Sequence, residues 1–243
     1  MDTSDFKPEN RKAIPAIGYY PTERESTGTT LIACEYDGGV VVGTDSRTSR
    51  GSFVASRVTD KITPITDNLV VCRSGSSADT QNIADIVKYY IEYYSISEGA
   101  PLSVYRSSQI FRQILYRYRD AMQASVIVAG FDDKLGGQIY AIPLGGFVTR
   151  QHFTASGSGS GFVTGYLDKQ WRPNMTLEQV KELVRNAVFL ATYRDGSSGG
   201  VIRLATINKE GTHRDLFRPD QKDDFPKLFE PKSYSLLPPH VTQ

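Results

Sequence analysis

The order of strand and helix patterns along the chain is the feature that most constrains its fold. Apolar runs at 29–36 and 40–43 predict two β-strands joined by a hairpin turn at Asp37-Gly38-Gly39. A further apolar run of strand length lies at 69–72. The folded part of the chain is therefore expected to open with a group of strands.

Three helix patterns follow, each with apolar side chains on one face. The third opens with a capping box at Thr176-Leu177-Glu178-Gln179. Tyrosines at 89, 90, 93 and 94 are interpreted as a helix face that packs on the core or on a neighbouring chain. The apolar positions are Ile83, Ile86, Val87, Tyr90, Ile91 and Tyr94 in the first helix, Ile110, Phe111, Ile114, Leu115 and Tyr118 in the second, and Val180, Val184, Ala187, Val188 and Ala191 in the third.

More strands surround the third helix. They are predicted at 125–130, 138–142 and 146–155, and a last hairpin joins 200–207 to 213–217. Long amphipathic helices between groups of antiparallel strands predict an α+β fold, a layered sandwich with helices covering two packed sheets.

Composition excludes several classes of function. The chain has 243 residues, of which 39% are hydrophobic and 23% charged, which suits one folded domain. A formal net charge of +1 gives no reason to expect nucleic acid or an anionic membrane as a partner, and no apolar run approaches the length of a membrane span. Cys34 and Cys72 lie in apolar segments, so we expect buried free thiols in a reducing compartment.

The histidines place a limit on the chemistry. His152, His213 and His240 lack the spacing of metal ligands, so no metal or other cofactor is expected. If the protein is an enzyme, its general base is therefore expected to be a group other than histidine.

Thr29 can supply both a nucleophile and a base. An α-amino group has a pKa of about 7.7–8.0, so an N-terminal threonine carries a hydroxyl and a suitable base on one residue. Thr29 follows Gly28 at the start of the first core strand, directly after a polar leader. Until the Gly28–Thr29 bond is cut, the nitrogen of Thr29 is an amide, so the intact chain is expected to be latent.

Other segments can supply the remaining roles. Lys61 near the amine would disfavour its protonation and stabilise an alkoxide on Thr29, and Asp45 would keep that lysine charged and oriented. Gly75 lies in a Ser-Gly-Ser turn after a strand, where its backbone N–H can donate to an oxyanion.

Five motifs in register resemble those of a catalytic β subunit of the proteasome, from about residue 28 to 217. The resemblance implies a four-layer αββα sandwich of the N-terminal-nucleophile hydrolase type. It divides the chain into a propeptide at 1–28, a catalytic domain at 29–218 and an extended, proline-rich C-terminal arm at 219–243. The motifs are Gly28-Thr29-Thr30, Gly43-Thr44-Asp45-Ser46-Arg47, Asp60-Lys61, Gly157-Ser158-Gly159-Ser160 and Arg194-Asp195-Gly196-Ser197-Ser198-Gly199-Gly200.

The resemblance also assigns roles to individual residues. It implies that Thr29 is the nucleophile and that Asp45 and Lys61 tune its reactivity. It places hydrogen bonds around the amino terminus of Thr29, and it implies that an extended substrate pairs with the backbone as an added strand. The residues around the amino terminus are Ser158, Asp195 and Ser198, and those that pair with substrate are Ser49, Gly75 and Ser77.

Arg73 indicates the substrate preference that the resemblance implies. It lies two positions before Gly75, where the family places the floor of its primary side-chain pocket, and an arginine there favours an acidic side chain. The surrounding segment is most similar to the β1, caspase-like class, which cuts after acidic residues. Residues expected to complete this polar pocket are Thr48, Thr59, Thr63 and Gln81.

Alternative interpretations accompany these assignments. Asp45 and Lys61 can be an ordinary surface pair, and Arg73 can face a neighbouring subunit. The glycines at 157–161 lack the pattern of a phosphate-binding loop. Residues 196–200 match the G-x-S-x-G motif, but a helix precedes them and a strand follows, the reverse of a serine hydrolase elbow.

A ring scaffold without activity is the alternative function, since some β subunits lack the catalytic set. Here that set is present. The family works as β rings stacked with α rings, so the expected partners are other proteasome α and β subunits and unfolded polypeptide substrates, in the cytoplasm and nucleus, with no nucleic acid or membrane.

Overall fold

Residues 28–218 are described in the computed structural model of the chain. The predicted propeptide, except Gly28, and the whole of the predicted C-terminal arm at 219–243 lie outside these residues. Within them, ten of the strands form two five-stranded antiparallel sheets.

The first sheet carries both ends of the described chain. Its strand order is β10-β1-β2-β11-β12. The predicted hairpin at Asp37-Gly38 joins β1 to β2, and the predicted last hairpin forms β11 and β12. The strands are β1 (Leu31–Tyr36), β2 (Gly39–Thr44), β10 (Phe153–Ser156), β11 (Ile202–Asn208) and β12 (Gly211–Phe217).

The second sheet is built from strands that follow one another in order, β5-β6-β7-β8-β9. A separate short hairpin, β3 and β4, links the two sheets in sequence and was not predicted. The strands are β3 (Thr48–Arg50), β4 (Phe53–Ser56), β5 (Ile62–Thr66), β6 (Leu69–Gly75), β7 (Ala124–Asp132), β8 (Gly136–Ile142) and β9 (Thr149–Gln151).

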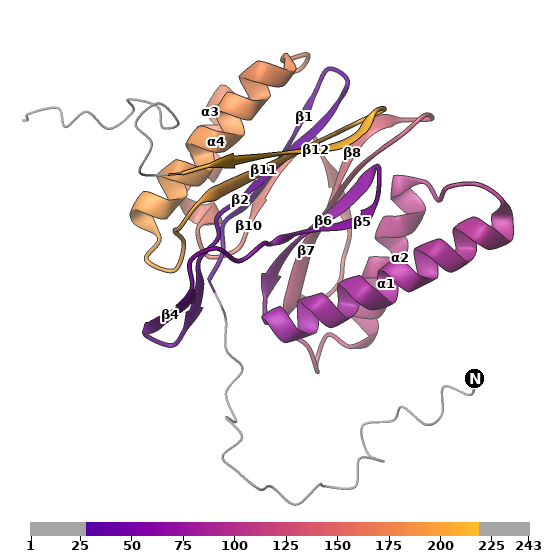
Figure 1. The fold of residues 1–243 in the computed structure, drawn as a ribbon, viewed down its shortest axis with the longest axis horizontal. Helices are drawn as coiled ribbons and strands as arrows, with labels where there is room; N and C mark the ends of the chain where they lie inside the picture. The colour runs from indigo at the N-terminus through magenta and orange to yellow at the C-terminus, as the bar shows by residue number, and fades with distance from the viewer. Residues whose placement is uncertain (1–27, 219–243) are drawn as a thin grey trace, which may run out of the picture.

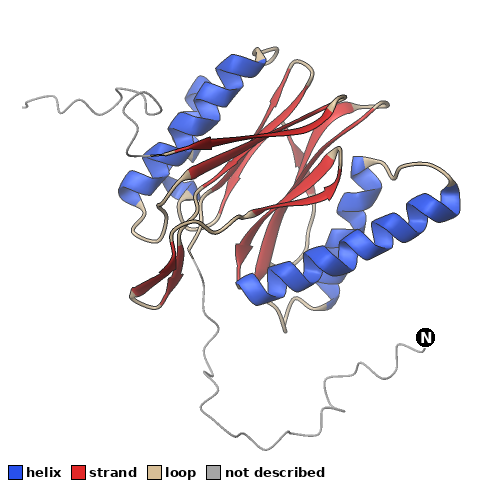
Figure 2. Cartoon of the chain, in the orientation of Figure 1, coloured by secondary structure: helices blue, strands red, loops and turns tan. Residues whose placement is uncertain are grey.

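The helices lie on the outer sides of the two sheets (Figures 1 and 2). α1 (Ser77–Glu98) and α2 (Val104–Arg117) pack against the second sheet, while α4 (Leu177–Arg194) packs against the first. The short α3 (Thr164–Gln170), preceded by a 3₁₀ turn at Ser160–Phe162, lies beside α4. The capping box of α4 forms as predicted, with Thr176 accepting from the backbone of Gln179 and Gln179 accepting in return.

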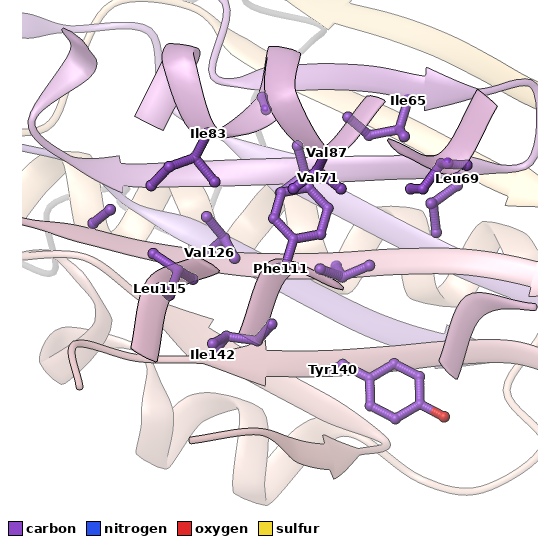
Figure 3. Packing of buried hydrophobic residues seen from close by; sticks show 14 of the residues in the cluster. Ile65, Leu69, Val71, Ile83, Val87, Phe111, Leu115, Val126, Tyr140 and Ile142 are labelled. Carbon is purple, nitrogen blue, oxygen red and sulfur yellow. The ribbon is translucent and has the colours of Figure 1, made fainter. Parts of the chain in front are cut away.

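Three buried apolar clusters hold these elements together. Figure 3 shows the cluster under α1 and α2, where Phe111 lies fully buried among Val71, Val87 and Val126. A second cluster joins α4 to the first sheet, and the third contains inward residues of both sheets, such as Leu31 and Ile127. The predicted α+β class is confirmed.

The predicted single strand at 146–155 is wrong. Thr149–Gln151 pairs with β8 in the second sheet, whereas Phe153–Ser156 pairs with β1 in the first. The chain passes from one sheet to the other at His152. Both segments are extended, so periodicity alone does not reveal the change of partner.

The apolar stripe of α1 is narrower than predicted. Ile83, Val87 and Ile91 are buried, but Tyr90 and Tyr94 remain 41% and 38% exposed. The tyrosines therefore do not pack into the core of this chain. They are long enough to lie along the helix surface, where their rings stack on one another at 6.4 Å between centroids.

Phe111→Ala tests the packing of the first cluster. Removing a fully buried phenylalanine should lower the free energy of unfolding by about 3–5 kcal/mol, because transfer energy is lost and a cavity remains. Denaturant unfolding of the purified chain measures this. Tyr89→Ala, which truncates a 65% exposed ring, is the control and should change stability by less than about 1 kcal/mol.

Candidate active site

Thr29 lies immediately before β1 and is almost fully buried, with 2% of its surface exposed. Its backbone N–H donates to Ser158 Oγ at 3.1 Å, and its carbonyl accepts from the N–H of Gly159 at 3.1 Å. Gly28 has φ of +62°, and a side chain there would collide with Ser197. These contacts fix the peptide bond between Gly28 and Thr29 within the 157–159 and 195–198 loops.

A buried ion pair lies beside this peptide. Lys61 Nζ is 2.8 Å from Asp45 Oδ1, and the two side chains are 5% and 0% exposed. The same carboxylate accepts three backbone N–H groups, from Thr30 at 2.9 Å, Gly199 at 3.0 Å and Arg47 at 3.1 Å. With every partner supplied by the protein, Asp45 holds Lys61 and three segments in one arrangement. The pair is therefore not a surface pair.

The carbonyl oxygen of Gly28 receives two donors. Lys61 Nζ donates to it at 3.0 Å, and the hydroxyl of Thr29 donates to the same oxygen. Burial lowers the pKa of Lys61, and the charge and hydrogen bond of Asp45 oppose that shift. The cationic head of Lys61 thus lies against the bond that must be cut to release the amine of Thr29.

A hydroxyl and carboxylate cluster surrounds the nitrogen of Thr29. Ser158 Oγ and Ser198 Oγ donate to the same Asp195 oxygen, at 2.7 and 2.6 Å. Ser198 Oγ also lies 2.7 Å from Thr30 Oγ1. The carboxylate of Asp195 therefore orients the hydroxyl that contacts the Thr29 nitrogen. Such a cluster can bind and orient an amine at that position.

Arg73 lies in a hollow that reaches Thr29 on one side. Its Nε donates to Thr63 Oγ1 at 2.7 Å, and its terminal nitrogens donate to Thr80 Oγ1 at 3.3 Å and to the carbonyl of Asp60 at 3.2 Å. Burial lowers the pKa of Arg73, opposed by the charge of Asp60. The hollow is lined by Thr29, Thr48, Thr59, Asp60, Lys61, Arg73, Gly75, Ser77, Thr80 and Gln81.

A second hollow adjoins Thr29 from another direction. It shares only Thr29 and Gly75 with the Arg73 hollow, so these two residues form the boundary between the two spaces. Its remaining lining carries no charged side chain and consists of Gly28, Ser74, Gln123, Ser125, Pro143, Leu144, Ser156, Gly157 and Ser158.

The structure brings together almost all of the site residues predicted from the sequence. Thr63 contributes by contacting Arg73, and Thr48 donates to Thr59 at 2.8 Å within the hollow. Ser49 is the exception, because it lies in β3 opposite Val54 and lines neither hollow.

Three contributors were missed. Thr30 bonds to Asp45 and Ser198, while Thr80 and the carbonyl of Asp60 hold Arg73. Thr30 follows Thr29 directly, and Asp60 precedes Lys61, so adjacency to a predicted site residue was the available signal. Thr80 could have been found from helix geometry, since it is three residues beyond Ser77 on the first turn of α1.

Residues 28–218 contain no group of three or more histidine, cysteine or acidic side chains arranged to hold a metal ion. In the same range, no helix has the length and apolarity required to cross a bilayer.

Asp45→Asn should leave the ammonium of Lys61 buried without its counter-charge. The free energy of unfolding should therefore fall by roughly 3–5 kcal/mol. The pKa of Lys61 in the folded chain should fall further below 10.5, its ordinary value. Between the folded and unfolded pKa values only the unfolded chain binds the proton. The free energy of unfolding of the variant should therefore rise as the pH increases toward the pKa of Lys61 in the unfolded chain. This rise should be steeper than in the wild type.

Denaturant unfolding at pH 7 and pH 9 checks this, with Asp133→Asn, an exposed acid, as the control. If the free energy of unfolding changes equally with pH in Asp45→Asn and Asp133→Asn, the electrostatic coupling between Asp45 and Lys61 is contradicted.

Comparisons with known proteins identify the family. A family model described as "Proteasome subunit" matches residues 25–207. The chain is 47% identical to "Proteasome subunit beta type-6" of Arabidopsis thaliana over 87% of this chain and 91% of that protein. It is 46% identical to "Probable proteasome subunit beta type-1" of Schizosaccharomyces pombe, over 82% and 88% of the two chains. It is 43% identical to "Proteasome subunit beta type-9" of Mus musculus bactrianus, over 90% and 99%. The chain therefore belongs to the proteasome family, as a β-type subunit that resembles the β1 class.

Proposed function

We propose that this β subunit of the 20S core is a threonine endopeptidase whose nucleophile is Thr29, formed when the Gly28–Thr29 bond is cut. The observation that carries the proposal is the set of contacts around one peptide bond. Lys61 and the Thr29 hydroxyl both donate to the Gly28 carbonyl, while Ser158 contacts the Thr29 nitrogen. The two sheets and their outer helices fit a four-layer αββα sandwich of the N-terminal-nucleophile hydrolase type.

The same contacts support activation within one chain. The Thr29 hydroxyl oxygen adds to the Gly28 carbonyl carbon, and Lys61 stabilises the oxyanion that forms. The C–N bond then breaks, the nitrogen takes up the proton lost by the hydroxyl, and Gly28 remains as an ester on Thr29. Water hydrolyses the ester, which releases the leader and leaves a free amine and hydroxyl on Thr29.

The free Thr29 can then act on a peptide substrate. Its amine accepts the hydroxyl proton as the oxygen attacks the substrate carbonyl, and the N–H of Gly75 is the proposed oxyanion donor. The substrate C–N bond breaks, the leaving amine takes the proton, and water cleaves the ester. Asp195 and Ser158 orient the Thr29 nitrogen, and the positive charge of Lys61 nearby disfavours protonation of the Thr29 amine.

Arg73 supports cleavage after acidic residues. Each of its three guanidinium nitrogens donates to a neutral oxygen, and none of these hydrogen bonds goes to a carboxylate. A substrate carboxylate can supply a negative charge next to Arg73 and bind it through charge-assisted hydrogen bonds. The hydroxyl-rich wall made by Thr48, Thr59 and Ser77 suits a polar side chain, in agreement with caspase-like activity.

We also propose assembly with other α and β proteasome subunits in stacked rings that degrade unfolded polypeptides, including ubiquitin-dependent substrates. The names of the relatives, all proteasome β subunits, support this partnership. Buried free thiols at Cys34 and Cys72 are compatible with the reducing cytoplasm and nucleus.

Thr29→Ala tests the activation step, with Thr29→Ser as the matched control. The alanine variant has no hydroxyl to attack Gly28, so the chain in the assembled particle should keep its leader. The serine variant keeps the hydroxyl and should begin at residue 29. N-terminal sequencing reads both outcomes. A leader removed from the alanine variant at the same bond would assign the cut to another protein.

Arg73→Leu tests the specificity. Cleavage of a peptide with Glu before the scissile bond should fall by roughly 10- to 100-fold in kcat/KM, because a charge-assisted hydrogen bond is lost. A peptide with Leu at that position should be cleaved as well as or better than by the wild type. Arg73→Lys keeps the charge and should retain part of the acidic preference. Undiminished cleavage after Glu in the leucine variant would place specificity elsewhere.

A further inference from the structure

The backbone of Gly75 packs closely against a residue outside its own strand. It ends β6 with φ of +104°, and a Cβ built there would collide with the carbonyl oxygen of Gln123. Gly75 lines both hollows, while Gln123 lines the second hollow only. The orientation of the Gly75 peptide is therefore coupled to the position of Gln123, the residue directly before β7.

Gln123 is itself held by the first turn of α1. Its carbonyl accepts from the N–H of Ser76 at 2.8 Å, and its N–H donates to Asp79 Oδ2 at 3.1 Å. The N–H of Asp79 donates in turn to Ser76 Oγ at 3.3 Å, which caps the helix. Ser76, Gln123 and Asp79 thus form a closed ring of hydrogen bonds that follows Gly75 directly.

Asp79 is the only side chain in this ring that reaches from α1 to the Gln123 backbone. Ser76 bonds to Gln123 through its own main chain, so that contact holds only while both backbones keep their places. The carboxylate adds a charge-assisted hydrogen bond, which is stronger than a bond between neutral groups. Without it, Gln123 loses one of its two contacts with this turn, and so does the backbone of Gly75, whose Cα packs against the Gln123 carbonyl and whose N–H lies on the other side of that Cα.

We infer that Asp79 is a positioning residue for the reaction: through Gln123 it fixes the backbone of Gly75, and with it the Gly75 N–H, at the boundary of the two hollows beside Thr29. The inference rests on the proposed function, in which the Gly75 N–H stabilises the oxyanion. An oxyanion donor acts mainly in the transition state, so its displacement lowers kcat more than it raises KM. Two of the three contacts that hold Arg73, from Thr63 and the Asp60 carbonyl, come from outside α1, so the Arg73 hollow depends less on Asp79 than the Gly75 backbone does.

Assembled core particles carrying Asp79→Ala or Glu92→Ala provide the test. Glu92 is an exposed acid on the same helix, remote from both hollows, so it matches the change in charge. With rates normalised to the fraction of chains that begin at Thr29, Asp79→Ala should lower kcat about tenfold for a Glu-containing peptide, with KM within about twofold. Asp79→Asn keeps an oxygen acceptor and should recover kcat to within about two- to threefold of the wild type. Glu92→Ala should behave as the wild type.

Amide hydrogen exchange supplies a readout that does not depend on activity. Exchange at Gly75–Ser76 and Gln123 should be faster in Asp79→Ala than in Glu92→Ala, with the rest of α1 unchanged. Faster exchange in Asp79→Ala, together with wild-type particles in which this subunit cleaves no peptide, would support the positioning role of Asp79. It would overturn the proposed function instead. Equal exchange and equal kcat in the two variants would overturn the role of Asp79, as would a loss expressed only in KM.

If Asp79→Ala does not assemble, Asp79→Asn decides the question. A neutral acceptor weakens the bond to Gln123, so exchange at Gln123 should be measurably faster and kcat lower by about two- to threefold. Wild-type exchange and wild-type kcat in that variant would overturn the inference.

Discussion

The buried ion pair between Lys61 and Asp45 is the interaction on which the rest of the site depends. An isolated charge in this position is costly, so each partner needs the other and the backbone donors that complete the carboxylate. Those donors are Thr30, directly before β1, Arg47, in the segment after β2, and Gly199, in the loop after α4. One carboxylate thereby ties together segments that are far apart in sequence, and it places the lysine head at the Gly28 carbonyl.

The proposed latency rests on the same geometry. The nitrogen of Thr29 already lies against Ser158, and Ser158 against Asp195, while that nitrogen is still part of a peptide bond. The groups that orient the amine in the proposed enzyme are therefore in place before the amine exists. In the proposed activation, cutting the bond changes the chemistry of one nitrogen that Ser158 already contacts. Gly75, at the boundary of the two hollows, likewise has its conformation set by packing against Gln123.

Much of this arrangement could be predicted from the sequence because its signals are local. The capping box at Thr176 and the hairpin at Asp37-Gly38 each depend on neighbouring residues, and both form. The change of sheet at His152 could not be predicted, because an extended segment looks the same whichever strand it pairs with. In the site, the ordered motifs identified Lys61 and its partners, but the contact between Asp79 and Gln123 joins residues 44 positions apart and has no sequence signature.

The central claim is that Thr29 carries both the nucleophile and the base. Peptide mapping by mass spectrometry, after treating assembled particles with an epoxyketone probe that bears an acidic side chain, tests this most directly. Such a probe forms a ring that needs both a hydroxyl and a free amine on one residue. We expect an N-terminal peptide that begins at Thr29 and carries the probe on both its oxygen and its nitrogen. A peptide that begins at Thr29 without the probe, or a probe attached to Ser198, would contradict it.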